Sequence, residues 1–457
     1  SRPARVPAQR QCTMQVSGIV ARASPLHISD SALAVPFVHA TPVPRQWESP
    51  ASLPRRSLPL RWTGVATTAA VATARIRRRR PALPISVQEA TGADTAPSRR
   101  NLVATVGITL LQQPAFAADY AVERVIPQSR LTAGLADAAP RTVVITGANS
   151  GVGLAGAKYL TAAGHRVICA CRTQEKADSA AAACMAYAQG APRAGSAVGY
   201  ACDLADLASI KAFVANLAAR KEKVDTLALN AGLSLNATEK GSKFVQRTAN
   251  GFEVTVGTNH LGHFALANLL EPTLAAAAEP RMVITASPVH DPKSGGGDVG
   301  PPASVGDLSG LTNANFEMVD GGSFDPDKAY KDSKLCNLLF MAEAVRRFGP
   351  KGITVNAFSP GLIADPNGFF RYQNSIFANA FNQISRFAGV AETSEFGGAA
   401  LAYLAVDSEM KTGQGGWYDS YPPGKHQLAL HAPSEEARRL DKQERLWKLS
   451  EELVAAV

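Results

Sequence analysis

The sequence predicts an α/β fold: a single Rossmann-type doubly wound parallel sheet with helices on both faces, preceded by a disordered targeting leader. Three observations support this prediction. A β-branched run over 142–146 meets a glycine-rich turn and then an Ala/Leu-rich segment. Short apolar runs then alternate with amphipathic segments along the chain. Finally, the charge composition changes abruptly near residue 100.

The first hundred residues have the composition of a targeting leader, and we assign residues 1–118 to plastid targeting. Residues 1–100 hold 15 arginines, no lysine and four acids, which gives 15 − 4 = +11. The whole chain is +9, so residues 101–457 carry 9 − 11 = −2. An Arg- and Ser-rich, acid-poor segment is typical of an organelle transit peptide. We therefore expect no nucleic-acid partner, despite the run Arg77–Arg80.

A second signal follows within the leader. Arg99-Arg100 precede the apolar run 102–111, and Ala115-Phe116-Ala117-Ala118 offers a small-residue cleavage site. One interpretation is a twin-arginine-type thylakoid signal that leads to the lumen. The alternative is a transit peptide with an incidental apolar patch, which leaves the protein in the stroma or associated with thylakoids. The run is too short to span a bilayer.

The folded part is expected over 140–457 and opens with the candidate cofactor turn. Strand 142–146 runs into Gly147-Ala148-Asn149-Ser150-Gly151-Val152-Gly153, and a helix follows to Ala163, closed by Gly164. Glycines let the backbone approach a pyrophosphate, and the helix N-terminus offers free N–H groups to it. Gly147, Asn149, Ser150, Gly151, Val152 and Gly153 are therefore candidate cofactor contacts.

The next strands supply the remaining cofactor candidates. Strand 166–170 ends at Arg172, and an arginine there suits a 2′-phosphate, so Arg172 with Lys176 predicts NADPH over NADH. Strand 198–202 ends at Asp203-Leu204, near the expected adenine. Strand 227–229 ends at Asn230-Ala231-Gly232, beneath the cofactor. In doubly wound sheets, ligands lie beyond the carboxyl ends of the strands, where all of these residues fall.

The expected catalytic residues come from three later segments. A helix opening at Thr258 carries Asn259, and strand 282–287 ends in Ser287. A long excursion, 295–322, precedes a helix with Tyr330 and Lys334, four residues apart and so on one face. A lysine beside a phenol lowers its pKa, which makes Tyr330 the candidate proton donor. Ser287 would orient the substrate, and Asn259 would hold a water near Lys334.

The C-terminal third holds the expected substrate side. Strand 352–358 ends in Ser359-Pro360-Gly361, with Pro360 and Gly361 expected near the cofactor. An aromatic segment that includes Phe369, Phe370 and Tyr372 sits where a lid would cover the nicotinamide, which makes a large flat apolar substrate plausible. A final short strand over 413–421 and a helix over 434–455 complete the chain. His260 and His263 have no third ligand nearby, and the cysteines have no ligand spacing, so we expect no metal.

The combination of the glycine turn, Asn230-Ala231-Gly232, Asn259, Ser287, Tyr330 and Lys334 resembles the short-chain dehydrogenase/reductase family over about 140–425. The segments 251–264, 301–311, 320–337 and 446–451 resemble more closely its light-dependent protochlorophyllide oxidoreductase branch. The resemblance implies a plastid enzyme that binds NADPH and protochlorophyllide and reduces the pigment's C17–C18 double bond in light. Peripheral thylakoid association and a homo-oligomer are compatible with it.

The pigment side departs from that branch. Ser359-Pro360-Gly361-Leu362 stands where the branch typically reads Tyr-Pro-Gly-Cys, and Ser234 replaces an aromatic residue. Leu362 can neither donate a proton nor form a hydrogen bond. Two alternatives therefore stay open: a light-independent NADPH carbonyl reductase on a lipid- or retinoid-like substrate, and a non-catalytic pigment-binding paralogue. The intact Ser287, Tyr330 and Lys334 argue against the latter.

Overall fold

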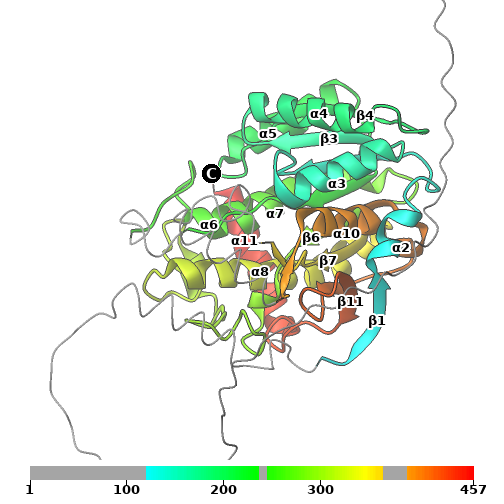
Figure 1. Cartoon of the computed structure of the whole chain (residues 1–457). Coiled ribbons are helices and arrows are strands. Elements are labelled where there is room, and N and C mark those ends of the chain that lie inside the picture. The colour runs from blue at the N-terminus through cyan, green and yellow to red at the C-terminus, as the bar shows by residue number, and fades with distance from the viewer. Residues whose placement is uncertain (1–119, 236–243, 364–388, 457) are drawn as a thin grey trace, which may run out of the picture. The chain divides into compact units, whose positions relative to one another are not determined.

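The core of the protein is one nine-stranded sheet in the order β1-β11-β10-β7-β6-β5-β2-β3-β4 (Figure 1). It is seen in a computed structural model that describes residues 120–235, 244–363 and 389–456. All neighbours from β10 to β4 are parallel, and β1 and β11 are antiparallel. The strands are β1 Val122–Pro127, β2 Thr142–Thr146, β3 Arg166–Cys171, β4 Ser196–Ala201, β5 Thr226–Leu229, β6 Arg281–Thr285, β7 Thr354–Phe358, β10 Trp417–Ser420 and β11 Gln427–His431. This confirms the predicted fold class.

Helices cover both faces of the sheet (Figure 1). One core cluster joins the sheet to α2 Gln128–Ala133, α3 Gly151–Ala162, α4 Gln174–Ala188 and α10 Ser394–Val406. The other joins it to α5 Leu207–Ala219, α6 Val254–Val256, α7 Gly262–Ala275, α8 Pro326–Phe348 and α11 Leu440–Ala455. The strands β2, β5 and β6 are buried at every position, as expected for a parallel sheet covered on both sides.

Two antiparallel strands were not predicted. The segment over 413–421 is not the final strand, because β10 is followed by a hairpin into β11, and β11 pairs in turn with β1. Strand β1 also lies N-terminal to the boundary expected at residue 140. Five of its six residues are exposed and only Ile126 is buried, so it carries little of the apolar periodicity on which strand prediction depends.

The helix with Asn259 also begins earlier than predicted. It starts at Val254, because the buried carboxylate of Glu253 accepts hydrogen bonds from the backbone N–H groups of Thr255 (2.8 Å) and Val256 (2.7 Å). A π-helical turn, Gly257–Leu261, then separates α6 from α7. Such turns inside α-helices are frequent at functional sites.

The excursion between Ser287 and α8 is packed rather than extended into solvent. It contains the short 3₁₀ helices η3 Pro288–His290 and η4 Ser309–Thr312. Its apolar residues Val305, Leu308 and Leu311 are almost fully buried in the same core as α8 and α11. The predicted leader lies outside the described residues. Within the described part of the chain, no helix is long and apolar enough to cross a membrane.

Candidate active site

The glycine turn after β2 has the tight geometry that cofactor binding requires. Gly147 and Gly151 have φ of 68° and 51°, in the left-handed region that glycine adopts without strain. A Cβ on Gly153 would lie 2.5 Å from the Gly147 carbonyl oxygen and 2.6 Å from Asn230 Nδ2. No side chain fits there, so the start of α3 packs directly against the backbone of Gly147 and the side chain of Asn230.

The N-terminus of α3 is open for an anion. Ser150 occupies the cap position, but its side chain makes no capping hydrogen bond to the first turn. Its neighbours Asn149, Gly151 and Val152 are at least partly exposed. Free N–H groups and the helix dipole at such an end favour a phosphate. The arrangement therefore fits a pyrophosphate at the predicted position.

Arg172 lies just beyond the end of β3 with an exposed side chain. The next helix, α4, begins after Thr173, whose hydroxyl accepts a hydrogen bond from the Lys176 backbone N–H at 3.4 Å. This cap brings Lys176 to the same strand end as Arg172. Both cations are exposed there, as a 2′-phosphate contact requires.

Asp203 and Leu204 follow β4 with different environments. One carboxylate oxygen of Asp203 accepts a hydrogen bond from the Ala205 N–H at 3.0 Å, so it partly serves its own turn. Leu204 is buried, and a Cβ on Gly262 would lie 2.2 Å from its carbonyl oxygen. Leu204 thus packs against the start of α7, and the Asp203 carboxylate keeps acceptor capacity for an adenine amino group.

The end of β5 is tied to β2 and to the π-helical turn. Thr146 Oγ1 accepts hydrogen bonds from the N–H groups of Asn230 (2.8 Å) and Ala231 (3.0 Å). Asn259 Oδ1 accepts from the Leu233 N–H (2.9 Å), and Asn259 Nδ2 donates to Leu233 O (2.9 Å) and to Ser333 Oγ (3.0 Å). Both amide hydrogens of Asn259 are therefore used to join the 230–233 segment to α8.

Ser287, Tyr330 and Lys334 come together at the carboxyl edge of the sheet. The Ser287 side chain lies close to the Tyr330 hydroxyl. Lys334 Nζ lies 5.5 Å from the centre of the Tyr330 ring and donates to the Thr285 carbonyl oxygen at 3.3 Å. A Cβ on Gly232 would be 3.5 Å from that Nζ, so the lysine also approaches the end of β5.

The expected lowering of the Tyr330 pKa is not seen in the protein's own groups. Burial raises the pKa of the Tyr330 phenol well above its ordinary value, and the neighbouring Ser287 side chain opposes this only in part. Burial also lowers the pKa of Lys334 to about 8. The lysine lies over the ring rather than beside the hydroxyl, which explains its weak influence. Tyr330 is thus held in its protonated form at neutral pH.

The residues between Tyr330 and Lys334 hold the excursion. Lys331 Nζ donates to the carbonyl oxygens of Gly297 (3.1 Å), Val299 (2.5 Å) and Pro301 (2.9 Å). The fully buried Asp332 accepts from the Ser304 N–H at 2.9 Å. These contacts attach the excursion directly beside the candidate proton donor.

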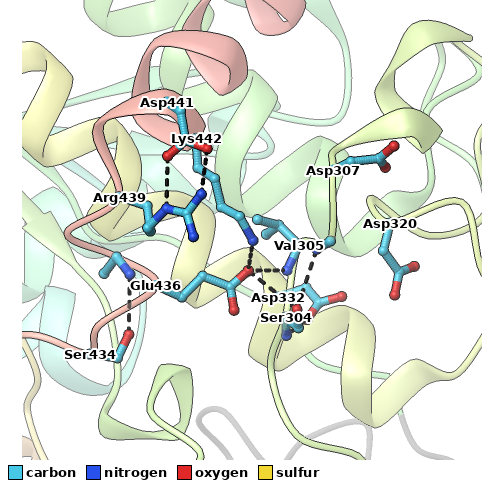
Figure 2. Close-up of polar contacts among 12 residues, drawn as sticks. Ser304, Val305, Asp307, Asp320, Asp332, Ser434, Glu436, Arg439, Asp441 and Lys442 are labelled. Atoms are coloured by element: carbon cyan, nitrogen blue, oxygen red, sulfur yellow. Dashed lines mark hydrogen bonds and ion pairs between the residues drawn. The ribbon is translucent and has the colours of Figure 1, made fainter.

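The same excursion is attached to the C-terminal segment through one carboxylate (Figure 2). Glu436 Oε1 accepts from Ser304 Oγ (3.2 Å), Val305 N (3.0 Å) and Lys442 Nζ (2.6 Å). Burial raises the pKa of the neighbouring Asp332 to about 7, although Lys328 opposes the shift. The candidate site therefore rests on segments that are far apart in the sequence.

On the substrate side, Ser359 is fully buried. Its Oγ accepts from the Gly361 N–H at 3.0 Å, and the buried Asp419 carboxylate lies nearby. Leu362 opens a short strand, β8 Leu362–Ile363, which pairs with β9 Ala391–Glu392 and is half-buried. Pro360 is half-buried against Gly397 of α10, and Ser234 is buried near the end of β5. The candidates Phe369, Phe370 and Tyr372 lie outside the described residues.

Sequence reasoning missed two buried residues that brace this side. The side chain of Glu392 accepts from Ser420 Oγ at 2.6 Å and pairs with His426 Nδ1 at 2.5 Å. His290 contacts the Ser287 carbonyl oxygen at 2.7 Å. Their partners include residues distant in the chain, so no local pattern could have identified them. Within the described part of the chain, no group of His, Cys, Asp and Glu could hold a metal ion.

Comparisons with known proteins agree with this geometry. The short chain dehydrogenase family profile matches residues 141–296. The chain is 36% identical over 365 residues to the chloroplastic protochlorophyllide reductase of Marchantia paleacea, covering 78% of this chain and 77% of the relative. It is 38% identical to protochlorophyllide reductase A of Arabidopsis thaliana (68% and 76% covered) and 40% identical to that of Oryza sativa subsp. japonica (69% and 81% covered).

Among solved structures, an uncharacterised protein from Mycobacterium paratuberculosis matches with a TM-score of 0.50 and 28% identity, covering 70% of this chain and 97% of that one. The identity and coverage of the plant relatives exceed what a shared fold alone would give. The chain is therefore an oxidoreductase that uses a nicotinamide cofactor, and it belongs to the protochlorophyllide reductase family of the short-chain dehydrogenases/reductases.

Proposed function

We propose that this protein catalyses the light-driven, NADPH-dependent reduction of protochlorophyllide to chlorophyllide in the chloroplast. The observation that carries the proposal is the pair Ser287 and Tyr330, whose hydroxyl groups lie close together, with Lys334 Nζ 5.5 Å from the centre of the Tyr330 ring. The pair lies at the same sheet edge as the uncapped N-terminus of α3. The relatives named chloroplastic protochlorophyllide reductase support the choice of substrate and compartment.

The described residues fit NADPH. The glycine turn and the open end of α3 would hold the pyrophosphate, and Arg172 with Lys176 would hold the 2′-phosphate. Asp203, Asn230 and Gly232 would border the adenine and nicotinamide halves, and Pro360 and Gly361 would close the nicotinamide end. When bound, NADPH supplies the hydride.

Tyr330 would supply the proton. Its raised pKa keeps the hydroxyl protonated before the reaction, as a proton donor requires. Once the proton leaves, the phenolate would be stabilised by the nearby Ser287 hydroxyl and, more weakly, by the Lys334 ammonium over its ring. With a pKa of about 8, Lys334 is largely charged at neutral pH.

The substrate would lie against Ser287, Ser234 and the Ser359–Leu362 turn, with the segment that carries Phe369, Phe370 and Tyr372 contributing further contacts. A large, flat, mostly apolar pigment suits this wall, since Leu362 is half-buried and aliphatic and Ser359 is fully buried with its hydroxyl bonded to the Gly361 N–H. Stromal or thylakoid-associated residence, cleavage of a leader ending near 118 and a homo-oligomer remain part of the proposal.

A second candidate is a light-independent NADPH carbonyl reductase acting on a lipid- or retinoid-like molecule. The specific observation in its favour is Leu362, which brings no proton-bearing group to the β8 position. A third candidate, a non-catalytic pigment-binding protein, is disfavoured by the Ser287–Tyr330 contact. A pure binding protein gains nothing from a buried phenol poised to give a proton.

One experiment distinguishes these functions. The full chain is mixed with NADPH and protochlorophyllide in darkness and then illuminated by a brief flash, with absorbance recorded throughout. Chlorophyllide formed only after the flash supports the proposal. Pigment binding without turnover would indicate the binding protein, and NADPH oxidation with a carbonyl substrate in darkness, without pigment binding, would indicate the carbonyl reductase.

A further inference from the structure

A buried histidine, His290, is bonded to the backbone of the candidate serine. His290 Nδ1 lies 2.7 Å from the Ser287 carbonyl oxygen, and the Ser434 backbone N–H donates to His290 Nε2 at 3.1 Å. A carbonyl can only accept, and an N–H can only donate. The two contacts therefore require a neutral ring with its proton on Nδ1.

The surroundings keep the ring in this one state. His290 is 2% exposed and packs edge-on against Trp417, with 5.2 Å between the ring centres. Burial lowers its pKa to about 4, so the ring stays neutral across the working pH range. A neutral imidazole with one donor and one acceptor matches a carbonyl on one side and an N–H on the other.

These bonds act on the residue that contacts Tyr330. The Ser287 carbonyl oxygen accepts two hydrogen bonds from His290, one from Nδ1 and one from its backbone N–H at 3.2 Å. The Ser287 side chain meanwhile accepts from the Val289 N–H at 3.4 Å and contacts the Tyr330 hydroxyl. The bonds to the carbonyl hold the backbone of Ser287, and the Val289 N–H favours one direction of its side chain.

We propose that His290 is a positioning residue, which acts through Ser287 by linking its carbonyl to the backbone of Ser434. The inference rests on the proposed function, in which Ser287 orients the substrate and supports Tyr330. It also makes the segment before α11 part of the active-site frame, since Ser434 supplies the other end of the link.

A double-mutant cycle tests this role in the full chain. His290→Phe keeps the ring volume and loses both hydrogen bonds, so the flash-driven turnover number should fall about 10- to 100-fold while the KM for NADPH stays unchanged. His290→Asn retains a donor where Nδ1 stood and should stay within about fivefold of the wild type. In a Ser287→Ala background, His290→Phe should lower the turnover number by less than about a further threefold, because its effect passes through Ser287.

His165 provides a matched control. It is also fully buried and also joins two backbone groups, since its Nδ1 accepts from the Arg141 N–H (3.2 Å) and its Nε2 contacts Leu135 O (2.9 Å). It lies at the amino-terminal edge of the sheet, away from the site. His165→Phe should lower the unfolding midpoint without changing turnover per folded molecule.

The outcomes separate the two proposals. If Ser287→Ala retains full turnover, the proposed role of Ser287 fails. If Ser287→Ala lowers turnover but His290→Phe has the same effect in both backgrounds, the positioning role is overturned while the proposed function stands. Equal losses of turnover in His290→Phe and His165→Phe would also overturn it, because they would reflect stability alone.

Discussion

The two sides of the candidate site treat their polar groups differently. On the cofactor side, the N–H groups at the start of α3 have no side-chain cap, and Arg172 is exposed at its strand end. On the substrate side, the Ser359 hydroxyl accepts a hydrogen bond from the Gly361 N–H, and the Glu392 carboxylate is bonded to Ser420 and His426. One side keeps its donors available, and the other uses its polar groups within the protein.

This difference indicates two kinds of recognition. A phosphate-bearing cofactor is selected by charge and hydrogen bonds, which need donors held ready in fixed positions. A pigment-like substrate beside Ser359 and Leu362 would be selected mainly by shape and apolar contact, because few polar groups there are free to bind it. Four substitutions can break or sharpen this comparison.

The largest effect is expected at Tyr330, where the two sides meet. Tyr330→Phe removes the proposed proton and the contact with Ser287, so flash-driven turnover should fall by about 10²- to 10⁴-fold. NADPH affinity, measured by fluorescence titration, should change far less. Tyr403→Phe, in which another buried tyrosine loses its hydrogen bond to Glu409, serves as the control. Turnover near the wild-type level in Tyr330→Phe would show that another group supplies the proton.

The buried Lys334 side chain is expected to destabilise the folded protein at neutral pH. Its pKa is about 8 in the folded protein and 10.5 ordinarily, so the unfolded chain binds more protons between these values and stability rises with pH in that window. Lys334→Met should therefore be more stable at pH 7 by up to about 3 kcal/mol, and the gap should close between pH 8 and 10.5.

Urea titrations at several pH values measure the difference in the free energy of unfolding between Lys334→Met and the wild type. Lys328→Met is the contrasting control, because Lys328 bonds Asp332 at 2.5 Å and Asp320 at 2.9 Å and its removal should destabilise the protein. A gap at Lys334 that does not vary with pH would contradict the assignment.

Arg172 tests the charge-based recognition on the cofactor side. Arg172→Ala should raise the KM for NADPH by about 10- to 100-fold, since a charge-assisted hydrogen bond to the 2′-phosphate is lost. The KM for NADH should hardly change, because NADH lacks that phosphate. Steady-state kinetics with both cofactors would decide, and equal effects on the two would refute the 2′-phosphate assignment.

The smallest effect is expected at Leu362. Leu362→Cys places a proton-bearing group in the half-buried β8 position and should raise photoreduction by about two- to fivefold. Leu362→Ala shortens the side chain without adding a thiol and should give no increase. If both variants behave alike, the substrate side responds only to volume, which would strengthen the shape-based interpretation.

The parts of the fold that follow local rules were predictable from sequence. The buried runs of β2, β3, β5, β6 and β7 and the glycine turn have strong periodic or steric signals, and each lies within a residue or two of its expected place. Strand β1 and the start of α6 were not predictable. The former is mostly exposed, and the latter depends on capping by the buried Glu253.

The candidate site divides in the same way. Tyr330, Lys334 and Ser287 could be identified because family motifs and strand ends mark them. The direction of the Tyr330 pKa could not, since it depends on burial and on where the Lys334 side chain lies, which spacing alone does not fix. His290 and Glu392 were invisible for a related reason. Each acts through partners brought close only by the folded chain.

The three positions between Tyr330 and Lys334 change how the motif itself should be understood. Motif searches treat them as free, but in this chain Lys331 carries three carbonyl bonds, Asp332 is fully buried and Ser333 bonds Asn259. A homologue that keeps the tyrosine and the lysine but varies these three residues would retain the chemistry and lose the attachment of the excursion. In evolutionary terms, we expect the intervening residues to vary together with the excursion, so that they would sort relatives that the Tyr330–Lys334 pair cannot distinguish.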